Sequence, residues 1–255
     1  MNTKPPLINR RTAFTLVEVI VMIAIIALLA LFYLPNFASR RPQRSIRINC
    51  MNNLKQIGIA YRIWANDNGD LWPSQQTISN GGWADLLTNA NQGPSCWTNY
   101  AIMQNELGQS PKLVVCPCEE RQPASSFTNQ FNNLNVSYFV GVSANDLNPQ
   151  AFAAGDRNLG PGLISSNDFG YSPKSGKGND VAIPITSAKG PVSWSLKIHS
   201  DGNTNGAGDI LLGDGSGQMV STATLNQTWL RNADPTTNWP AGHIPATPSI
   251  RLVFP

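Results

Sequence analysis

The sequence predicts an α+β fold: a long N-terminal helix, transmembrane in its first half, followed by a mainly antiparallel β head. Sixteen successive apolar residues, from Val19 to Leu34, indicate the helix. Beyond residue 69, short apolar runs alternate with segments rich in Gly, Asn, Pro and Ser, which is typical of strands joined by turns. With 255 residues, 41% of them hydrophobic, the chain can form one such helix and one head with its own core.

The N-terminal region is expected to divide into a polar leader, residues 1–13, and an apolar helix, residues 14–35. The segment Phe14–Leu34 contains 21 residues. At ~1.5 Å per residue, a helix of that length spans roughly 31 Å, the thickness of a bilayer core. Pro35 follows the apolar run, where we expect it to end or kink the helix.

Glu18 decides between three interpretations of this segment. A cleaved secretory signal predicts a shorter apolar run without an acid. A plain signal anchor leaves Glu18 unexplained, because a carboxylate within a membrane costs about 2.5–3.5 kcal/mol. The third interpretation accounts for the acid: residues 10–19, RRTAFTLVEV, resemble the class III prepilin signal.

The prepilin resemblance implies a processing site and an assembly role. A prepilin peptidase would cut between Ala13, where the family usually has Gly, and Phe14, which would become the N-methylated first residue. Glu18 would then pair with the Phe14 amine of a neighbouring subunit in a filament, so that two costly charges satisfy each other. Thr15 and Glu18 also match a capping box for the first amides of the helix, and the two roles are compatible.

Residues 36–68 are expected to continue the helix as an amphipathic segment that packs on the head. Apolar residues recur at steps of three and four, which places them on one helical face: Ile46, Cys50, Leu54, Ile57, Tyr61 and Trp64. The opposite face is polar, with Arg47, Asn52, Asn53, Lys55 and Arg62. The turn cluster NDNGD at residues 66–70 ends the helix.

Residues 69–255 form the predicted β-rich extracytoplasmic head. We expect strands at Lys112–Cys116, Val136–Val142, Val181–Ile185, Val192–His199 and Asp209–Leu212. Asp214-Gly215 predicts a hairpin turn after the last of these strands. Thr222–Asn232 predicts a short helix.

Several segments resemble a family of pseudopilin-like proteins that pair a prepilin helix with a variable β-rich head. The matching segments are residues 50–73, 113–117, 137–141 and 155–159. The family also has a C-terminal His followed, after nine residues, by Asp-Gly. Here fourteen residues separate His199 from Asp214, which we interpret as a lengthened loop between two strands.

The four cysteines, Cys50, Cys96, Cys116 and Cys118, could bind a metal or form disulfides. A zinc site usually has cysteines two residues apart with histidines at matching spacing, and this chain has only two histidines. An even number of cysteines in an exported head favours disulfides. Four cysteines allow three pairings, among which we favour Cys50–Cys116 with Cys96–Cys118.

Two further patterns favour structural roles over chemical ones. Asp201, Asn203 and Asn205 resemble the first half of a calcium loop, but Leu212 stands where that loop needs an acid. We therefore favour an Asn/Gly turn, with calcium as the alternative and no other cofactor. His199 with Asp201 could suggest acid–base catalysis, yet no nucleophile motif accompanies them, so we expect a hydrogen-bonded structural histidine and no enzyme.

The motifs together predict a structural subunit of a pseudopilus or type IV pilus-like filament, in type II secretion or a related system. The expected partners are other pilin or pseudopilin subunits, the prepilin peptidase and the inner membrane. The chain would cross that membrane once, with its N-terminus cytoplasmic and its head periplasmic or extracellular. The net charge of +3, without a basic stripe interleaved with aromatics, gives no indication of nucleic acid. The alternative is a membrane-anchored cell-surface binding protein that uses the prepilin route only for processing.

Overall fold

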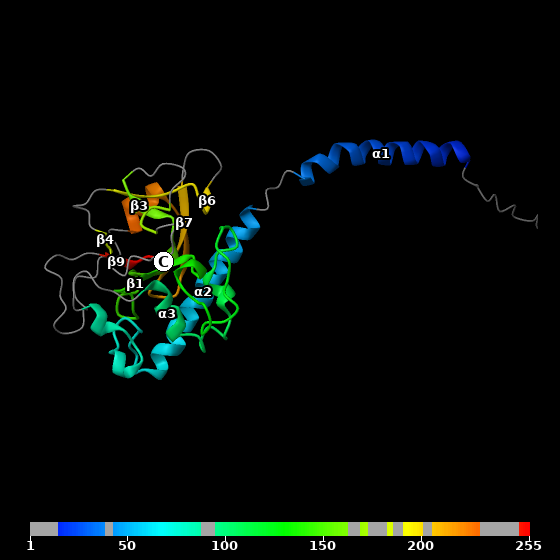
Figure 1. Ribbon diagram of the computed structural model, residues 1–255. Helices are drawn as coiled ribbons and strands as arrows, with labels where there is room; N and C mark the ends of the chain where they lie inside the picture. The colour runs from blue at the N-terminus through cyan, green and yellow to red at the C-terminus, as the bar shows by residue number, and fades with distance from the viewer. Residues whose placement is uncertain are drawn as a thin grey trace, which may run out of the picture. The chain divides into compact units, whose positions relative to one another are not determined.

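Figure 1 shows the computed structural model of the chain, which falls into two compact units, Met1–Pro42 and Gln43–Pro255. The structure describes residues 15–38, 43–87, 95–162, 169–172, 183–185, 191–200, 206–229 and 250–255. The first unit contains the helix α1. The second contains the helix α2, several short helices and all the described strands.

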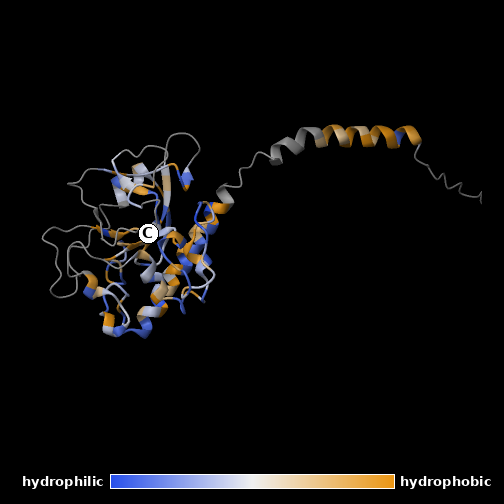
Figure 2. Cartoon of the chain, in the orientation of Figure 1, coloured by the Kyte–Doolittle hydropathy of each residue, from blue (hydrophilic) through white to orange (hydrophobic). Residues whose placement is uncertain are grey.

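Helix α1, Leu16–Ala38, begins with the predicted capping box. The Thr15 N–H donates to Glu18 Oε2 at 2.8 Å, and the Glu18 N–H donates to Thr15 Oγ1 at 3.4 Å. These bonds satisfy amides at the helix start that have no partner within the helix. From Leu16 to Ala30 the side chains are exposed, and Figure 2 colours almost all of this stretch as hydrophobic.

The expectation of one long helix, transmembrane in residues 14–35, is wrong. α1 and α2 are separate helices, and no helix among the described residues is both long and apolar enough to cross a membrane. A spanning helix needs about 20 consecutive apolar residues. The single-pass inner-membrane location and the membrane anchor are corrected for the same reason.

Helix α2, Gln43–Asp67, packs its apolar stripe against the sheet of the second unit. Five of the predicted inward residues are buried: Cys50, Leu54, Ile57, Tyr61 and Trp64. Arg47 differs from the prediction, because its side chain points towards the sheet and pairs with a buried acid. The helix ends at the predicted turn, where Gly69 adopts a left-handed conformation with φ 71°.

The second unit is built on an antiparallel sheet with the strand order β4-β9-β1-β2-β7-β6, in which β8 also pairs with β7. Its strands are β1 (Tyr138–Gly141), β2 (Phe152–Asp156), β4 (Ile183–Ile185), β6 (His199–Ser200), β7 (Gly206–Leu212), β8 (Gly217–Ser221) and β9 (Ile250–Val253). A separate antiparallel pair joins β3 (Leu159–Pro161) to β5 (Val192–Trp194).

Four of the predicted strands are confirmed. The segment 136–142 contains β1, and 181–185 contains β4. The segment 192–199 contains β5 and the start of β6, and 209–212 is part of β7. The Asp214-Gly215 turn joins β7 to β8, with Gly215 at φ 81°. The strand expected at Lys112–Cys116 is wrong: Pro111 starts a short 3-10 helix there, because its fixed φ and missing N–H suit a helix start. Strands β2, β3 and β9 were not predicted.

Short helices occupy the connections between these elements. They are η1 (Ile78–Asn80), η2 (Ala84–Leu87), α3 (Cys96–Ile102), η3 (Pro111–Val114), η4 (Asn133–Asn135), α4 (Thr222–Thr224) and the π-helix η6 (Leu225–Trp229). The last two stand where one helix was predicted.

The strands β1, β2, β7 and β9 are almost entirely buried, and alternate residues of β1 and β7 belong to different cores. In β1, Tyr138 and Val140 belong to the core beneath α2, while Phe139 belongs to the core on the other face. In β7, Leu211 faces α2 and Ile210 faces away. The strands are therefore almost continuously apolar, and a polar side chain on the α2 face must be satisfied inside the protein.

Candidate functional site

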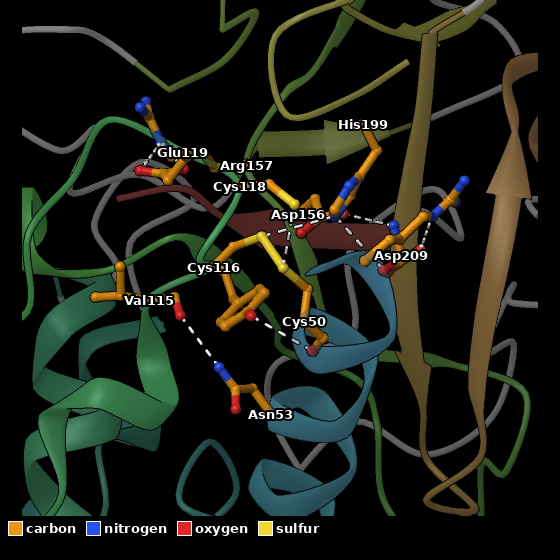
Figure 3. The surroundings of a disulfide bond; sticks show 12 residues. Cys50, Asn53, Val115, Cys116, Cys118, Glu119, Asp156, Arg157, His199 and Asp209 are labelled. Carbon is orange, nitrogen blue, oxygen red and sulfur yellow. Dashed lines mark hydrogen bonds and ion pairs between the residues drawn. A yellow bond between two sulfur atoms is a disulfide. The ribbon is translucent and has the colours of Figure 1, made fainter. Parts of the chain in front are cut away.

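Seven polar or sulfur-bearing side chains meet where the first two turns of α2 lie against the sheet (Figure 3). α2 and the loop after η3 supply two each, and the strands β2, β7 and β6 supply one each. The residues are Arg47 and Cys50, Cys116 and Cys118, and Asp156, Asp209 and His199. Because β2, β7 and β6 are neighbours, the sheet brings residues far apart in the chain to one point.

The sulfur side of this centre holds a disulfide and a third cysteine. Cys50 is bonded to Cys116, 66 residues away, so this pair of the favoured pairing is present. The second pair, Cys96–Cys118, is wrong. Cys118 lies instead beside the disulfide, with its Sγ 3.9 Å from Cys50 Sγ. Cys96 is buried elsewhere, where its thiol donates to the Tyr138 carbonyl at 3.2 Å.

The carboxylate side consists of two adjacent buried acids and a histidine. The backbone N–H of Asp209 donates to Asp156 Oδ2 at 2.6 Å, and Arg47 Nε donates to Asp209 Oδ1 at 2.8 Å. His199 Nε2 lies 3.4 Å from Asp156 Oδ2 and 3.5 Å from Asp209 Oδ2. The same nitrogen lies 3.6 Å from Cys116 Sγ. His199 therefore stands between the sulfur atoms and the carboxylates.

Burial controls the charges in this centre. Burial lowers the pKa of His199 to about 3, and Arg47 adds to that effect, so the imidazole is neutral at physiological pH. Burial, followed by the repulsion of Asp209, raises the pKa of Asp156 well above its ordinary value. Burial also raises the pKa of Asp209 to about 6, although Arg47 opposes the shift. The resulting centre has one fixed cation, one carboxylate paired with it and a second carboxyl group that favours its proton.

These side chains are more suited to binding than to nucleophilic attack. Burial raises the pKa of Cys118 to about 11, and the nearby Asp156 and Asp209 add to the shift, so its thiol stays protonated and unreactive. Two overlapping sets of donor atoms are close enough together to hold a metal ion: Cys50, Cys116, Cys118 and His199, or Asp156, His199 and Asp209. Soft sulfur and imidazole donors of the first set suit zinc.

A second buried polar cluster has its charges paired within the chain. Arg157 Nε donates to both carboxylate oxygens of Glu119, at 3.1 and 2.9 Å, and its guanidinium lies 3.6 Å above the ring of Phe169. Arg121 donates to the Asn133 carbonyl at 2.7 Å. Both arginines also line a surface pocket. Because these bonds tie the loop after η3 to the residue that follows β2, we assign the cluster a structural role.

Several predicted site residues lie outside the described part of the chain. They are Ala13 and Phe14 of the processing site, and Asp201, Asn203 and Asn205 of the calcium alternative. Glu18 is described and serves as the helix cap. His199 is buried, and its strand β6 pairs antiparallel with β7.

Sequence reasoning missed the three ionisable residues around His199. Arg47 was assigned to the polar face of its helix, and Asp209 was counted within an apolar strand. Asp156 belongs to a segment, 155–159, that was noted only for its resemblance. An acid inside a run of buried strand residues is the signal that could have identified Asp209, because such a group requires a partner.

No family model, curated protein or solved structure matches the chain.

Proposed function

We propose that the chain is a structural subunit of a pilin-like filament, in which the α1 helices of many copies pack together. This function is supported by the exposed apolar surface of α1 and by the single acid at its start. The prepilin resemblance of residues 10–19 supports the same function. The buried centre of the second unit then serves to hold the head together rather than to catalyse a reaction.

The apolar surface of α1 requires a partner. Leu16 is 79% exposed, Ile23 61% and Ile26 63%. Burying a large apolar side chain is worth about 1.5–3 kcal/mol. Several such side chains packed against a second copy offset the ~4–15 kcal/mol that association costs in lost freedom of motion. A filament supplies this burial for every subunit.

The charge of α1 favours other copies of the same chain as the partner. Glu18 is the only side chain in the sequence of α1 that carries a charge at neutral pH. Hydrogen bonds from the Thr15 backbone and then its hydroxyl hold the pKa of Glu18 below its ordinary value, so Glu18 is an anion on the exposed helix of the single chain. Cleavage before Phe14 would give each copy one N-terminal amine, four residues ahead of the one carboxylate of α1. Anion and cation would then match one to one between neighbours.

Substitution of Glu18 by Gln tests this proposal, because it separates charge from capping. A glutamine at this position still completes the capping box, but it cannot pair with an amine. The full chain and the Glu18→Gln variant are each produced together with a prepilin peptidase. We expect mass spectrometry to find N-methylated Phe14 at the start of the mature wild type. We expect electron microscopy to show wild-type filaments and a folded but unassembled variant.

Asp67→Asn is the matched control, since it makes the same carboxylate-to-amide change at an exposed position of α2. Filaments of this control should be normal. Normal filaments of Glu18→Gln would contradict the charge pairing. Failure of the processed wild type to form filaments would contradict the proposed function itself.

A further inference from the structure

We propose that Cys50, Cys116, Cys118 and His199 form a zinc site when the Cys50–Cys116 disulfide is reduced. The same four side chains would then cross-link the second unit in two alternative ways. In the oxidised protein they form a disulfide with a neighbouring thiol, and in the reduced protein three thiolates and an imidazole bind a zinc ion. This inference concerns the second unit alone and does not depend on filament assembly.

Two of the distances between the four donor atoms match those of a zinc tetrahedron. Zinc–sulfur bonds of about 2.3 Å and zinc–nitrogen bonds of about 2.0–2.1 Å place neighbouring donors roughly 3.5–3.8 Å apart. Cys50 Sγ lies 3.9 Å from Cys118 Sγ, and Cys116 Sγ lies 3.6 Å from His199 Nε2. All four donor atoms lie within 4.8 Å of one another. The two bonded sulfurs would have to move apart on reduction.

The same positions argue against simple thiol–disulfide exchange as the role of Cys118. In exchange, the attacking sulfur approaches along the axis of the breaking bond. An ordinary S–S bond is ~2.05 Å long. If Cys118 Sγ lay on the axis of the Cys50–Cys116 bond at its present distance from Cys50 Sγ, it would be about 6 Å from Cys116 Sγ. The sulfurs lie within 4.8 Å of one another, so they form a triangle instead of a line. A triangle of sulfurs is one face of a tetrahedral site.

The surroundings suit a structural zinc ion. Cys50 and Cys116 are fully buried and His199 is 4% exposed, which excludes water as a ligand, while the partly exposed Cys118 gives the ion a path inward. Three thiolates and one Zn²⁺ leave a net negative charge. The guanidinium of Arg47 pairs with Asp209 beside His199, so this nearby carboxylate is itself neutralised.

The chemistry requires a two-electron reductant, for which a dithiol is sufficient. The dithiol is oxidised to its own disulfide, the Cys50–Cys116 bond breaks, and each of these sulfurs becomes a thiol. Zn²⁺ then replaces the protons of the Cys50, Cys116 and Cys118 thiols and accepts the lone pair of neutral His199. Three protons are released to solvent for each zinc ion bound.

The test uses the full chain in both redox states with zinc and cobalt as probes. After reduction and removal of excess metal, we expect about one zinc per chain by elemental analysis. Co²⁺ in the same site should give thiolate-to-cobalt charge-transfer bands and the strong visible bands of tetrahedral cobalt. The oxidised chain should bind neither metal, because two of its ligands are bonded to each other.

Cys118→Ser and Cys96→Ser form a matched pair of variants. Both remove one of the two thiols outside the disulfide, but Cys96 lies outside the proposed ligand set. Loss of a residue that only hydrogen-bonds to a metal ligand typically weakens metal binding ~10–100-fold. Cys118→Ser removes a ligand itself, so it should weaken zinc binding by more than that. Its oxidised form should keep the Cys50–Cys116 bond, which shows that it folds. Absence of zinc and cobalt binding in the reduced wild type, or an equal loss in Cys96→Ser, would overturn the proposal.

Discussion

At the scale of single residues, the ion pair between Arg47 and Asp209 fixes the carboxylate side of the buried centre. Arg47 also donates to the Gly208 carbonyl at 3.1 Å, so one guanidinium holds both the acid and the backbone of β7. The Asp209 side chain is fully buried, whereas that of Arg47 is 24% exposed. Loss of the arginine therefore costs the acid more stabilisation than loss of the acid would cost the arginine, because only the acid is fully removed from water.

Removal of Arg47 alone should therefore destabilise the second unit more than removal of the pair. Arg47→Leu leaves a buried carboxylate without its cation, and we expect it to lower the free energy of unfolding by about 3–5 kcal/mol at pH 8. In the double variant Arg47→Leu/Asp209→Asn no buried charge is left unpaired, so most of that loss should be recovered. Urea unfolding of the oxidised proteins measures both values. A double variant as unstable as the single one would show that the arginine acts through packing instead.

At the scale of elements, α2 organises the second unit through one face of the helix. Cys50, Leu54, Ile57 and Tyr61 enter the core, while Ile59 and Ile63 on the same helix remain exposed. The helix therefore carries isoleucines in both environments, two residues apart. This arrangement separates the effect of burial from the effect of side-chain chemistry.

The two isoleucines provide a matched prediction for this packing. Ile57→Ala removes a fully buried side chain beneath the sheet, and we expect a loss of about 2–5 kcal/mol in the free energy of unfolding. Ile59→Ala makes the same change at a residue that is 57% exposed. There we expect a change within about 0.5 kcal/mol, because little apolar area returns to water. Similar losses in both variants, measured by chemical denaturation, would contradict the assigned face.

The periodicity of α2 and the Asp-Gly hairpin could be predicted because both are local signals in the sequence. Strand β2, with the sequence FAAGD, was missed because its small residues have low strand propensity, and its pairing with β1 and β7 decides its structure. The centre itself could not be assembled from the sequence. Its bonds join residues 66 positions apart, as in Cys50–Cys116, and 162 positions apart, as in Arg47–Asp209. No periodic pattern reports contacts at that separation.

At the scale of the whole molecule, the chain separates the surface proposed for assembly from the core that stabilises the head. No residue before Cys50 belongs to either hydrophobic core of the described structure. The described apolar side chains of α1 are exposed and contribute to neither core. The disulfide, the buried ion pairs and the sheet all belong to the unit Gln43–Pro255.

A chain that begins at Gln43 should therefore fold as the full chain does but should not assemble. It keeps every described core residue, so we expect its thermal unfolding midpoint to lie within about 2 °C of that of the full-length head transition. Without the exposed apolar residues of α1 it should sediment as a monomer at concentrations where the full chain forms large assemblies. Calorimetry and sedimentation velocity measure the two properties separately. A midpoint lowered by ten degrees or more, about 2.5–5 kcal/mol for a domain of this size, would show that the first unit stabilises the head. Assembly of the truncated chain would place the filament contact on the head instead of on α1.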